Sequence, residues 1–523
     1  MLHTKRNIWL FISLMLLFTV VIYSGVAQEP STIVFALEGS PPTFDPVQAA
    51  DSRVDAPSIN LYNALTQYPA GSTDIELDLA TDVMSAEDGL SYTFTLPSDV
   101  MFHDGTILTA ADVKYTVDRM VALNLGVARS LTMVTGADVV DDTTVIVNLS
   151  QSFPGFLGAM SRVYILNAEL VQANTVDDDW GQTWLQNNDA GSGPYMLTSF
   201  TPEQQYTMDM FPEYFKGWEG NHVDRAIFAV IKEEATRRLA LENGEADWIL
   251  VGTPETFDAL AENPAFTVNA DTTLNQLYFA MNTQNEYLQD VRIRKALSMA
   301  YDYVGHVEFA RNGFAEIARG PLPSGITCFD DAMQPSEMNI EAAKQLMADA
   351  GYPDGGFELK MAYQGTSPEE TAAMQIMQSG AGELGISISP LAIEWPAKVQ
   401  AYSAQETTPE LGTVWMYPSL PDPDQFFGLL AASDQAGGGG FNFSWYSNPD
   451  MDELVNAGKT ELDPVARCEL YSQAQELWVQ DTPYIDVVIG QALSASTVDV
   501  KGYQWSSPHS FTQNVYQMWI ESS

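Results

Sequence analysis

Apolar and polar residues alternate along several short segments of the chain, a pattern typical of strands with one buried face. In residues 92–96 (YTFTL), Tyr, Phe and Leu alternate with Thr. Residues 32–37 (TIVFAL) and 143–149 (TTVIVNL) are apolar runs of strand length, and residues 191–197 (GSGPYML) form a glycine-rich turn that leads into another strand. We therefore predict four strands at these places.

Other segments repeat their apolar residues with the period of a helix. In residues 110–123, Val113, Val117 and Met120 lie on one face, and Thr109 stands three residues before Asp112, as in a capping box. A helix is also expected in residues 233–243, before Gly244. Helix starts are predicted in the same way after the capping residues Asp290, Asn339 and Asp463.

Helices and strands follow one another, which predicts an α/β fold. Residues 233–243 run directly into the strand-like residues 247–251 (DWILV). The chain has 523 residues, enough for about three domains at roughly 150 residues each. Hydrophobic residues make up 46% of it, which allows a large core, and the net charge of −46 would repel phosphate backbones. We expect no nucleic-acid partner.

The first residues have the pattern of an export signal. Lys5 and Arg6 precede an apolar run over residues 8–22, and small residues follow at 25–27. We interpret residues 1–27 as a signal peptide, with Gln28 as the first mature residue. The same run is long enough to remain as an uncleaved anchor. No cysteine follows it, so no lipid-modified N-terminus is expected, and the protein is predicted to be exported to the periplasm or beyond.

The chain has two cysteines, Cys328 and Cys468. In an oxidising compartment such a pair can form one disulfide, and it is also compatible with two buried thiols. The sequence alone leaves both open.

Motifs of catalytic and metal sites are missing from the sequence. It contains no G-x-S-x-G and no H-E-x-x-H, and its histidines lie far apart. We expect no enzyme activity, no metal and no cofactor. Aromatic residues beside turns, such as Trp415 and Tyr417, are typical either of ordinary packing or of a cleft that holds a peptide or a sugar.

Six motifs together resemble a known family, the extracellular solute-binding proteins of ABC importers, family 5, which includes oligopeptide- and dipeptide-binding proteins. The motifs are SAEDGLSYTFTLPSDVMFHDGTILTAADVKYTVDR, GSGPYMLTSF, EYFKGW, ENGEADWIL, DVRIRKALSMAYD and AKQLMADAGYPDGG. The resemblance extends over residues 32–523.

The resemblance implies a two-lobed periplasmic-binding-protein fold (type II, cluster C-like) with an additional domain and a hinge of two chain crossings. Domain I would comprise residues 28–58, 190–284 and 492–523. Domain II would comprise residues 59–189, and domain III residues 285–491. A ligand would be enclosed between the lobes by hinge closure.

Two stretches match family positions that line the cleft. One comprises Ser52, Arg53, Val54 and Asp55. The other runs from residue 415 to 424 and contains the candidates Trp415, Tyr417, Asp422 and Asp424.

The second stretch departs from the family pattern at one position. In peptide-binding members, an aspartate three residues after a tryptophan pairs with the peptide's α-ammonium. Counted from Trp415, that position is Pro418, and Asp422 or Asp424 would have to supply the charge from a shifted register.

The expected function is capture of a short peptide and its delivery to the transmembrane subunits of an ABC permease, by a protein that works as a monomer. The alternatives left open are an oligosaccharide, a metal chelate or another small solute. A secreted glycosidase is a remote alternative, and a surface adhesin would need repeats that the sequence lacks.

Overall fold

The computed structural model describes residues 30–48, 52–438, 440–509 and 513–521. From Ser31 onward the described residues form one compact unit. The predicted signal segment, residues 1–27, lies outside them. In the described part of the chain, no helix has both the length and the apolar character needed to span a membrane.

A mixed sheet of eleven strands organises this unit. Strand β13 (Ala315–Ile317) pairs with β17 alone, beside the main path. The other strands, in spatial order, are β15 (Ser387–Ala392), β14 (Glu358–Tyr363), β16 (Leu411–Met416), β12 (Phe266–Met281), β17 (Tyr484–Thr497), β11 (Trp248–Val251), β1 (Thr32–Leu37), β10 (Arg225–Val230), β9 (Gln205–Met210) and β8 (Tyr195–Thr201).

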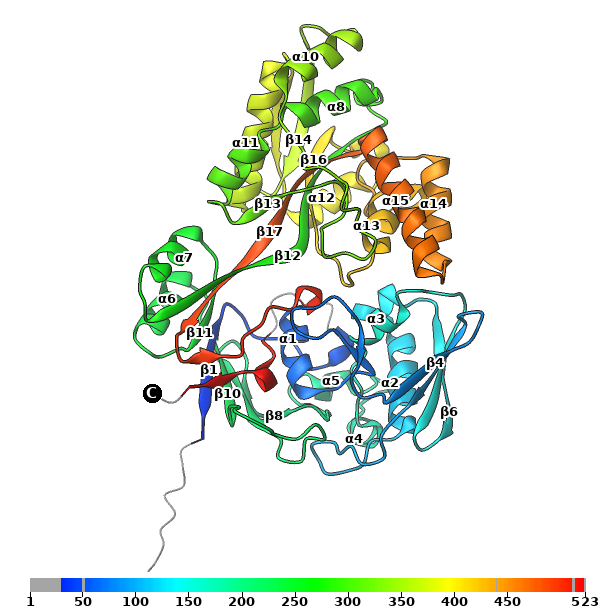
Figure 1. Cartoon of the computed structure of the whole chain (residues 1–523), viewed down its shortest axis with the longest axis vertical. Coiled ribbons are helices and arrows are strands. Elements are labelled where there is room, and N and C mark those ends of the chain that lie inside the picture. Colours follow the sequence, from blue (N-terminus) through cyan, green and yellow to red (C-terminus); the bar gives the residue numbers. More distant parts are fainter. Residues whose placement is uncertain (1–29, 49–51, 439, 510–512, 522–523) are drawn as a thin grey trace, which may run out of the picture. The chain divides into compact units, whose positions relative to one another are not determined.

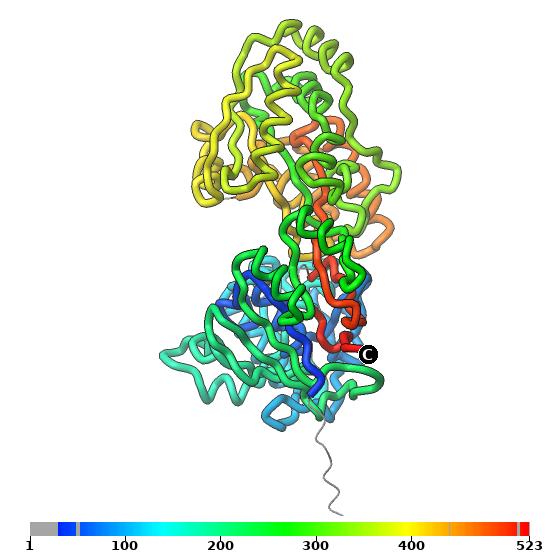
Figure 2. Tube along the Cα trace, turned by 90° about the vertical axis from the view of Figure 1, so that its left-hand side faces the viewer, coloured from blue at the N-terminus to red at the C-terminus, as the bar shows by residue number. Residues whose placement is uncertain are grey.

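Strands β12 and β17 join two groups of elements, as Figures 1 and 2 show. We call the elements before β12 and after β17 the first lobe, and the elements between these strands the second lobe. The two strands are antiparallel, and β17 also pairs with β11 of the first lobe, whereas β12 also pairs with β16 of the second. Their register is irregular between Thr272 and Gln276. The chain therefore crosses between the lobes twice.

The first lobe contains a second sheet of four antiparallel strands. In spatial order these are β4 (Asp82–Ser85), β5 (Ser91–Thr95), β7 (Thr144–Leu149) and β6 (Val134–Asp141). The helices of this lobe are α1 (Ser52–Leu61), α2 (Ala110–Leu123), α3 (Phe156–Met160), α4 (Ala168–Ala173), α5 (Gln182–Leu185), α6 (Glu234–Glu242) and α7 (Pro254–Ala261). Near the C-terminus of the chain, β18 (Val500–Lys501) pairs with β19 (Trp519–Ile520).

The predicted helix over residues 110–123 is confirmed as α2. At its start, the Asp112 carboxylate accepts a hydrogen bond from the Thr109 backbone N–H at 2.9 Å, as a capping box requires. Val113, Val117 and Met120 are buried in an apolar core with strands of the four-stranded sheet. The predicted strands are confirmed as β1, β5, β7 and β8.

The second lobe packs helices on both faces of its part of the large sheet (Figure 1). The predicted caps Asp290, Asn339 and Asp463 are confirmed, because each side chain accepts a backbone N–H at a helix start. Its helices are α8 (Val291–Ala300), α9 (Tyr303–Gly305), α10 (Ile340–Asp349), α11 (Pro368–Glu383), α12 (Trp395–Tyr402), α13 (Asp424–Leu430), α14 (Pro449–Thr460) and α15 (Pro464–Asp481).

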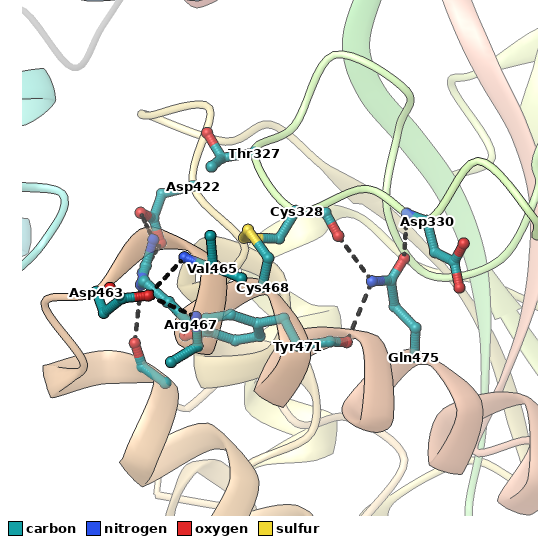
Figure 3. Close-up of a disulfide and its surroundings, with 12 residues drawn as sticks. Thr327, Cys328, Asp330, Asp422, Asp463, Val465, Arg467, Cys468, Tyr471 and Gln475 are labelled. Carbon is teal, nitrogen blue, oxygen red and sulfur yellow. Dashed lines mark hydrogen bonds and ion pairs between the residues drawn. A yellow bond between two sulfur atoms is a disulfide. The ribbon is translucent and has the colours of Figure 1, made fainter.

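The two cysteines form a disulfide in the second lobe. The Sγ atoms of Cys328 and Cys468 are 2.04 Å apart, and the bridge joins a loop after β13 to the first turns of α15 (Figure 3). It closes a loop of 140 residues, so it restricts the unfolded chain strongly.

Candidate ligand-binding site

A cavity of about 950 Å³ lies between residues of the two lobes. Its volume falls in the range of small-molecule binding sites. The first lobe contributes Arg129, Ser130, Thr132, Met133 and Phe153 to the lining. The remaining lining comes from the second lobe and from the two strands that join the lobes.

The floor of the cavity is made by β12 and β17. Thr273 and Asn275 of β12 lie in the stretch where the register between these strands is irregular, and Gly490, Gln491 and Ala492 of β17 lie beside them. The Thr273 hydroxyl donates to the Gly490 carbonyl oxygen at 2.7 Å. A Cβ at Gly490 would lie 3.1 Å from a guanidinium nitrogen of Arg311 and 3.4 Å from the Trp415 indole ring, so this glycine leaves room for both side chains. The floor of the cavity is thus built from the two strands that join the lobes.

Aromatic rings of the second lobe form one wall of the cavity. Trp415 is the second-last residue of β16, and its ring centroid lies 6.0 Å from that of Tyr417, which is 61% exposed. Trp395 of α12 stacks on Phe441 with centroids 6.3 Å apart. All four residues line the cavity. These flat faces can hold apolar groups or sugar rings.

In two ion pairs of this cavity wall, each charge is compensated by a partner within the wall. Arg311 donates to the Glu369 carboxylate at 3.0 Å, and Glu369 also lies 3.4 Å from His306 Nε2. Lys398 and Glu370 are almost fully buried, with Nζ and Oε2 3.1 Å apart, and Lys398 also donates to the Thr413 hydroxyl oxygen at 2.8 Å.

Burial lowers the pKa of Lys398, and Glu370 opposes this effect. These charges hold the wall together and are already compensated.

Asp424 is a lining carboxylate with spare hydrogen-bonding capacity. Its Oδ2 lies 3.7 Å from Lys459 Nζ, whereas its Oδ1 is buried and accepts no hydrogen bond from the described residues. Burial raises the pKa of Asp424, and Lys459 opposes the shift. A ligand donor that reached Oδ1 would remove part of the desolvation cost.

Arg129 is the lining cation on the first-lobe side. It lies in the short 3₁₀ helix Gly126–Ser130, is exposed, and forms no salt bridge with any described residue. Arg311, Lys398 and Lys459, the other lining cations, each lie within 4 Å of a carboxylate. Arg129 is therefore the cation available to a carboxylate of a ligand.

Asp422 is engaged elsewhere. Arg467 donates to both of its carboxylate oxygens, each at 2.9 Å, and both side chains are buried. Asp422 and Pro418 are not among the residues that line the cavity, whereas Trp415, Tyr417 and Asp424 are. Of the two aspartates expected to replace the family carboxylate, the structure leaves Asp424 available.

The first predicted stretch, residues 52–55, lies at the start of α1, and its described side chains, those of residues 53–55, do not line the cavity. The side chain of Ser52 lies outside the described part, Arg53 is exposed and Val54 is buried. Asp55 is buried, accepts from Tyr164 Oη at 2.9 Å and lies 3.1 Å from His509 Nδ1.

Burial acts to raise the pKa of Asp55, but Arg162 and His509 together hold it below its ordinary value. These contacts tie α1 to the C-terminal segment.

Both ring nitrogens of His103 have partners within the protein. Its Nδ1 lies 2.6 Å from Asp189 Oδ1, and its Nε2 lies 3.0 Å from the Gly193 carbonyl oxygen. The described residues contain no group of three His, Cys, Asp or Glu side chains placed to hold a metal ion.

Several lining residues carry no local sequence signal. Arg129, the group Gln364, Ser367 and Glu369, and Lys398 come from three separate stretches of the chain. None of these stretches carries a binding motif; the pairing of β14, β16 and β12 orders the second-lobe stretches, and Arg129 comes from the other lobe.

The fold and the cavity define a two-lobed, periplasmic-type solute-binding protein. Residues 74–438 match the bacterial extracellular solute-binding proteins, family 5 (middle region). The chain belongs to this family. It is a solute-binding protein of an ABC importer and a binding protein rather than an enzyme, and members of the family are periplasmic or extracellular.

Relatives match over nearly the whole chain. A probable D,D-dipeptide-binding periplasmic protein of Escherichia coli is 28% identical over 91% of this chain and 92% of its own length. Heme-binding protein A of Haemophilus influenzae is 26% identical over 91% of this chain and 90% of its own.

Among solved structures, HbpA2 from Haemophilus parasuis aligns with a TM-score of 0.85 at 24% identity, over 94% of this chain and 100% of that one. A dipeptide-binding protein from Pseudoalteromonas in complex with Met-Leu aligns with a TM-score of 0.75 at 21% identity, over 94% and 100%. The predicted two-lobed fold class is confirmed.

Proposed function

We propose that the protein captures a short peptide in the cavity between its lobes and delivers it to the transmembrane subunits of an ABC permease. Under the predicted division, the lobe of domain I (residues 28–58, 190–284 and 492–523) with its additional domain II (residues 59–189) and the lobe of domain III (residues 285–491) would close on the ligand about β12 and β17. Residues 1–27 would direct export. Relatives named for D,D-dipeptide and di/tripeptide binding support a peptide as the ligand.

The observation that carries the proposal is a pair of opposite charges on the cavity lining. Arg129 of the first lobe has no carboxylate partner among the described residues, and Asp424 Oδ1 of the second lobe has no donor among them. A free peptide is a zwitterion, with an α-carboxylate and an α-ammonium. In the proposed complex Arg129 binds the carboxylate and Asp424 binds the ammonium.

The energetic reason is desolvation. An ammonium enclosed without a counter-charge costs several kcal/mol. Pro418, at the family position for that carboxylate, offers neither charge nor a backbone donor. Asp422 is neutralised by Arg467. Asp424 is therefore the lining carboxylate that can replace the family aspartate.

An oligosaccharide is the second candidate, and the aromatic wall favours it. Trp395, Trp415, Tyr417 and Phe441 offer flat faces to a neutral ligand, which would need neither Arg129 nor Asp424.

Isothermal titration of the mature protein with trialanine and with N-acetyl-trialanine tests the proposal. We expect acetylation to weaken binding about a hundredfold, which corresponds to roughly 2.7 kcal/mol. Asp424→Asn should lose affinity for trialanine to a similar extent and should bind the two peptides about equally.

Asp354→Asn is the matched control, because it removes an exposed carboxylate of the same lobe that does not line the cavity. It should bind as the wild type does. Equal affinity of the wild type for both peptides would contradict the role of Asp424. Binding of a neutral oligosaccharide such as maltotriose, with no binding of either peptide, would favour the second candidate.

A further inference from the structure

The segment of residues 417–424 carries three cavity-lining residues, Tyr417, Ser419 and Asp424, but has little regular structure of its own. It connects β16 to α13 and forms neither helix nor strand before Asp424. Three of its eight residues are proline, at positions 418, 421 and 423, and therefore lack a backbone N–H. Such a segment cannot be held by a regular backbone ladder, so other groups must hold it.

Thr327 and Arg467 hold the middle of the segment, at Pro421 and Asp422. Thr327 donates twice to the Pro421 carbonyl oxygen, from its backbone N–H at 3.1 Å and from its hydroxyl at 2.9 Å. Arg467 donates to both oxygens of Asp422, each at 2.9 Å. Pro421 and Asp422 are buried, so these bonds are shielded from water.

Both anchors immediately precede a bridged cysteine. Thr327 is next to Cys328, and Arg467 is next to Cys468, so the disulfide fixes the two anchors to one another (Figure 3). Asp463 caps α15 four residues before Arg467 and accepts from the Val465 and Ala466 N–H groups. We call Thr327, Arg467 and the disulfide the clamp.

The clamped segment reaches into the first lobe. Leu420 is 2% exposed and belongs to the buried apolar cluster of the four-stranded sheet, which also contains Phe153 and Phe156. Asp422 lies against Gly155 so closely that a Cβ on this glycine would be 3.0 Å from Oδ2. Apart from Val47 and Leu420, every buried member of that cluster falls within residues 65–165.

A second contact between the lobes starts beside the clamp. Ser152 Oγ donates to the Thr460 carbonyl oxygen at 3.1 Å, and Leu462 packs against Gly89. Thr460 is the last residue of α14, and Leu462 lies in the connection to α15, directly before the helix that carries Arg467 and Cys468. The start of α15 therefore supports both contacts with the first lobe.

We propose that the clamp positions the ligand-binding wall: the disulfide fixes Thr327 and Arg467, and these residues hold residues 419–424 so that Asp424 faces the cavity and Leu420 docks into the first lobe. Thr327 and Arg467 are positioning residues for the site. Without the bridge, the two anchors separate, the segment loosens, and the lobes lose the Leu420 contact even though the second lobe stays folded. The consequence for ligand affinity rests on the proposed function; the positioning itself does not.

Hydrogen–deuterium exchange of the full chain without ligand tests the positioning. In the variant carrying both Cys328→Ser and Cys468→Ser, amide exchange should rise about tenfold in peptides covering residues 419–427 and residues 153–163. Peptides from α10 and α11 should change less than about twofold. Thr327→Val, which keeps the disulfide and removes one anchoring bond, should give a smaller rise in the same two regions.

Thr371→Val is the matched control, because it also removes one threonine hydroxyl bond in the second lobe, to the Ser367 carbonyl oxygen, away from the segment. It should leave both regions unchanged. Faster exchange confined to the residues beside the cysteines, or spread evenly over the second lobe, would overturn the proposal. If the double variant fails to fold, Thr327→Val decides between the outcomes. Amide exchange that does not rise in either region of this variant would overturn the proposal.

Titration with trialanine adds a second arm. If the wild type binds this peptide, the double cysteine variant should bind it at least about tenfold more weakly, because Asp424 is no longer held toward the cavity. Absence of binding to the wild type would count against the peptide proposal, while the exchange experiment would still judge the clamp.

Discussion

Asp486 of β17 is a buried carboxylate with a single donor. It is 9% exposed, its two oxygens lie 3.1 and 3.3 Å from Trp478 Nε1, and it forms no ion pair with a described residue. Tyr278 and Tyr303 are the ionisable neighbours that feel its charge. Burial raises the pKa of Asp486 to about 7, and the Trp478 hydrogen bond opposes the shift.

The raised pKa predicts a pH-dependent stability. Between the ordinary Asp value near 4 and about 7, the folded protein holds a proton that the unfolded chain has lost, so wild-type stability falls as pH rises through this window. Asp486→Asn removes this dependence. We expect the Tm of the variant relative to wild type to rise by about 2 to 5 °C between pH 5 and pH 8.

Thermal unfolding at several pH values measures this difference, with the exposed Asp354→Asn as control. A Tm difference that is the same at pH 5 and pH 8 would show that Asp486 does not titrate in this window.

At the scale of single site residues, the sequence predicted the second-lobe wall better than the first. Trp415, Tyr417 and Asp424 lie in one stretch at the end of β16 and beyond it, and all three line the cavity, although their contact with a ligand remains a prediction. Asp422 is only two residues from Asp424, and its capture by Arg467 depends on a helix 45 positions away. Arg129 has no neighbouring motif, and it became a candidate only because no carboxylate of the described structure pairs with it.

Among the elements, those with a local start signal were predictable. Helix α2 begins at its capping box and α15 at Asp463, whose side chain directly bonds backbone N–H groups. The long strands β12 and β17 have no such signal, because their length comes from pairing with different partners along the way. The domain boundaries remain a prediction for the same reason, since the chain changes lobes within continuous strands.

Helix α15 depends on its cap. The Asp463 Oδ1 accepts from the Val465 and Ala466 N–H groups at 3.0 and 2.9 Å. Asp463→Ala leaves both donors unsatisfied and should lower the free energy of unfolding by about 1 kcal/mol.

Urea unfolding measures this loss. Glu469→Gln, an exposed change on the same helix, should alter the free energy by less than about 0.5 kcal/mol. Equal effects of the two substitutions would contradict the capping role.

At the scale of the whole molecule, two lobes joined by two strands predict closure on ligand by a monomer. Small-angle scattering of the mature protein should show a smaller radius of gyration with a bound ligand than without, at a mass of one chain. The titration that establishes binding supplies the saturating ligand concentration. A radius that stays constant at saturation, or a dimer mass, would contradict this picture.

The position of the cavity floor has a mechanical consequence. Thr273, Asn275 and residues 490–492 lie at the crossing itself, where bending of β12 and β17 moves atoms least. Arg129 and Asp424 lie on opposite lobes, away from this crossing. A ligand bound only at the crossing of β12 and β17 would gain the same binding energy at every angle between the lobes. It would therefore not drive one lobe toward the other. Under the proposed closure, only a molecule long enough to touch both lobes turns its binding energy into rotation, so we expect the length of a solute, rather than its affinity, to decide whether it is enclosed.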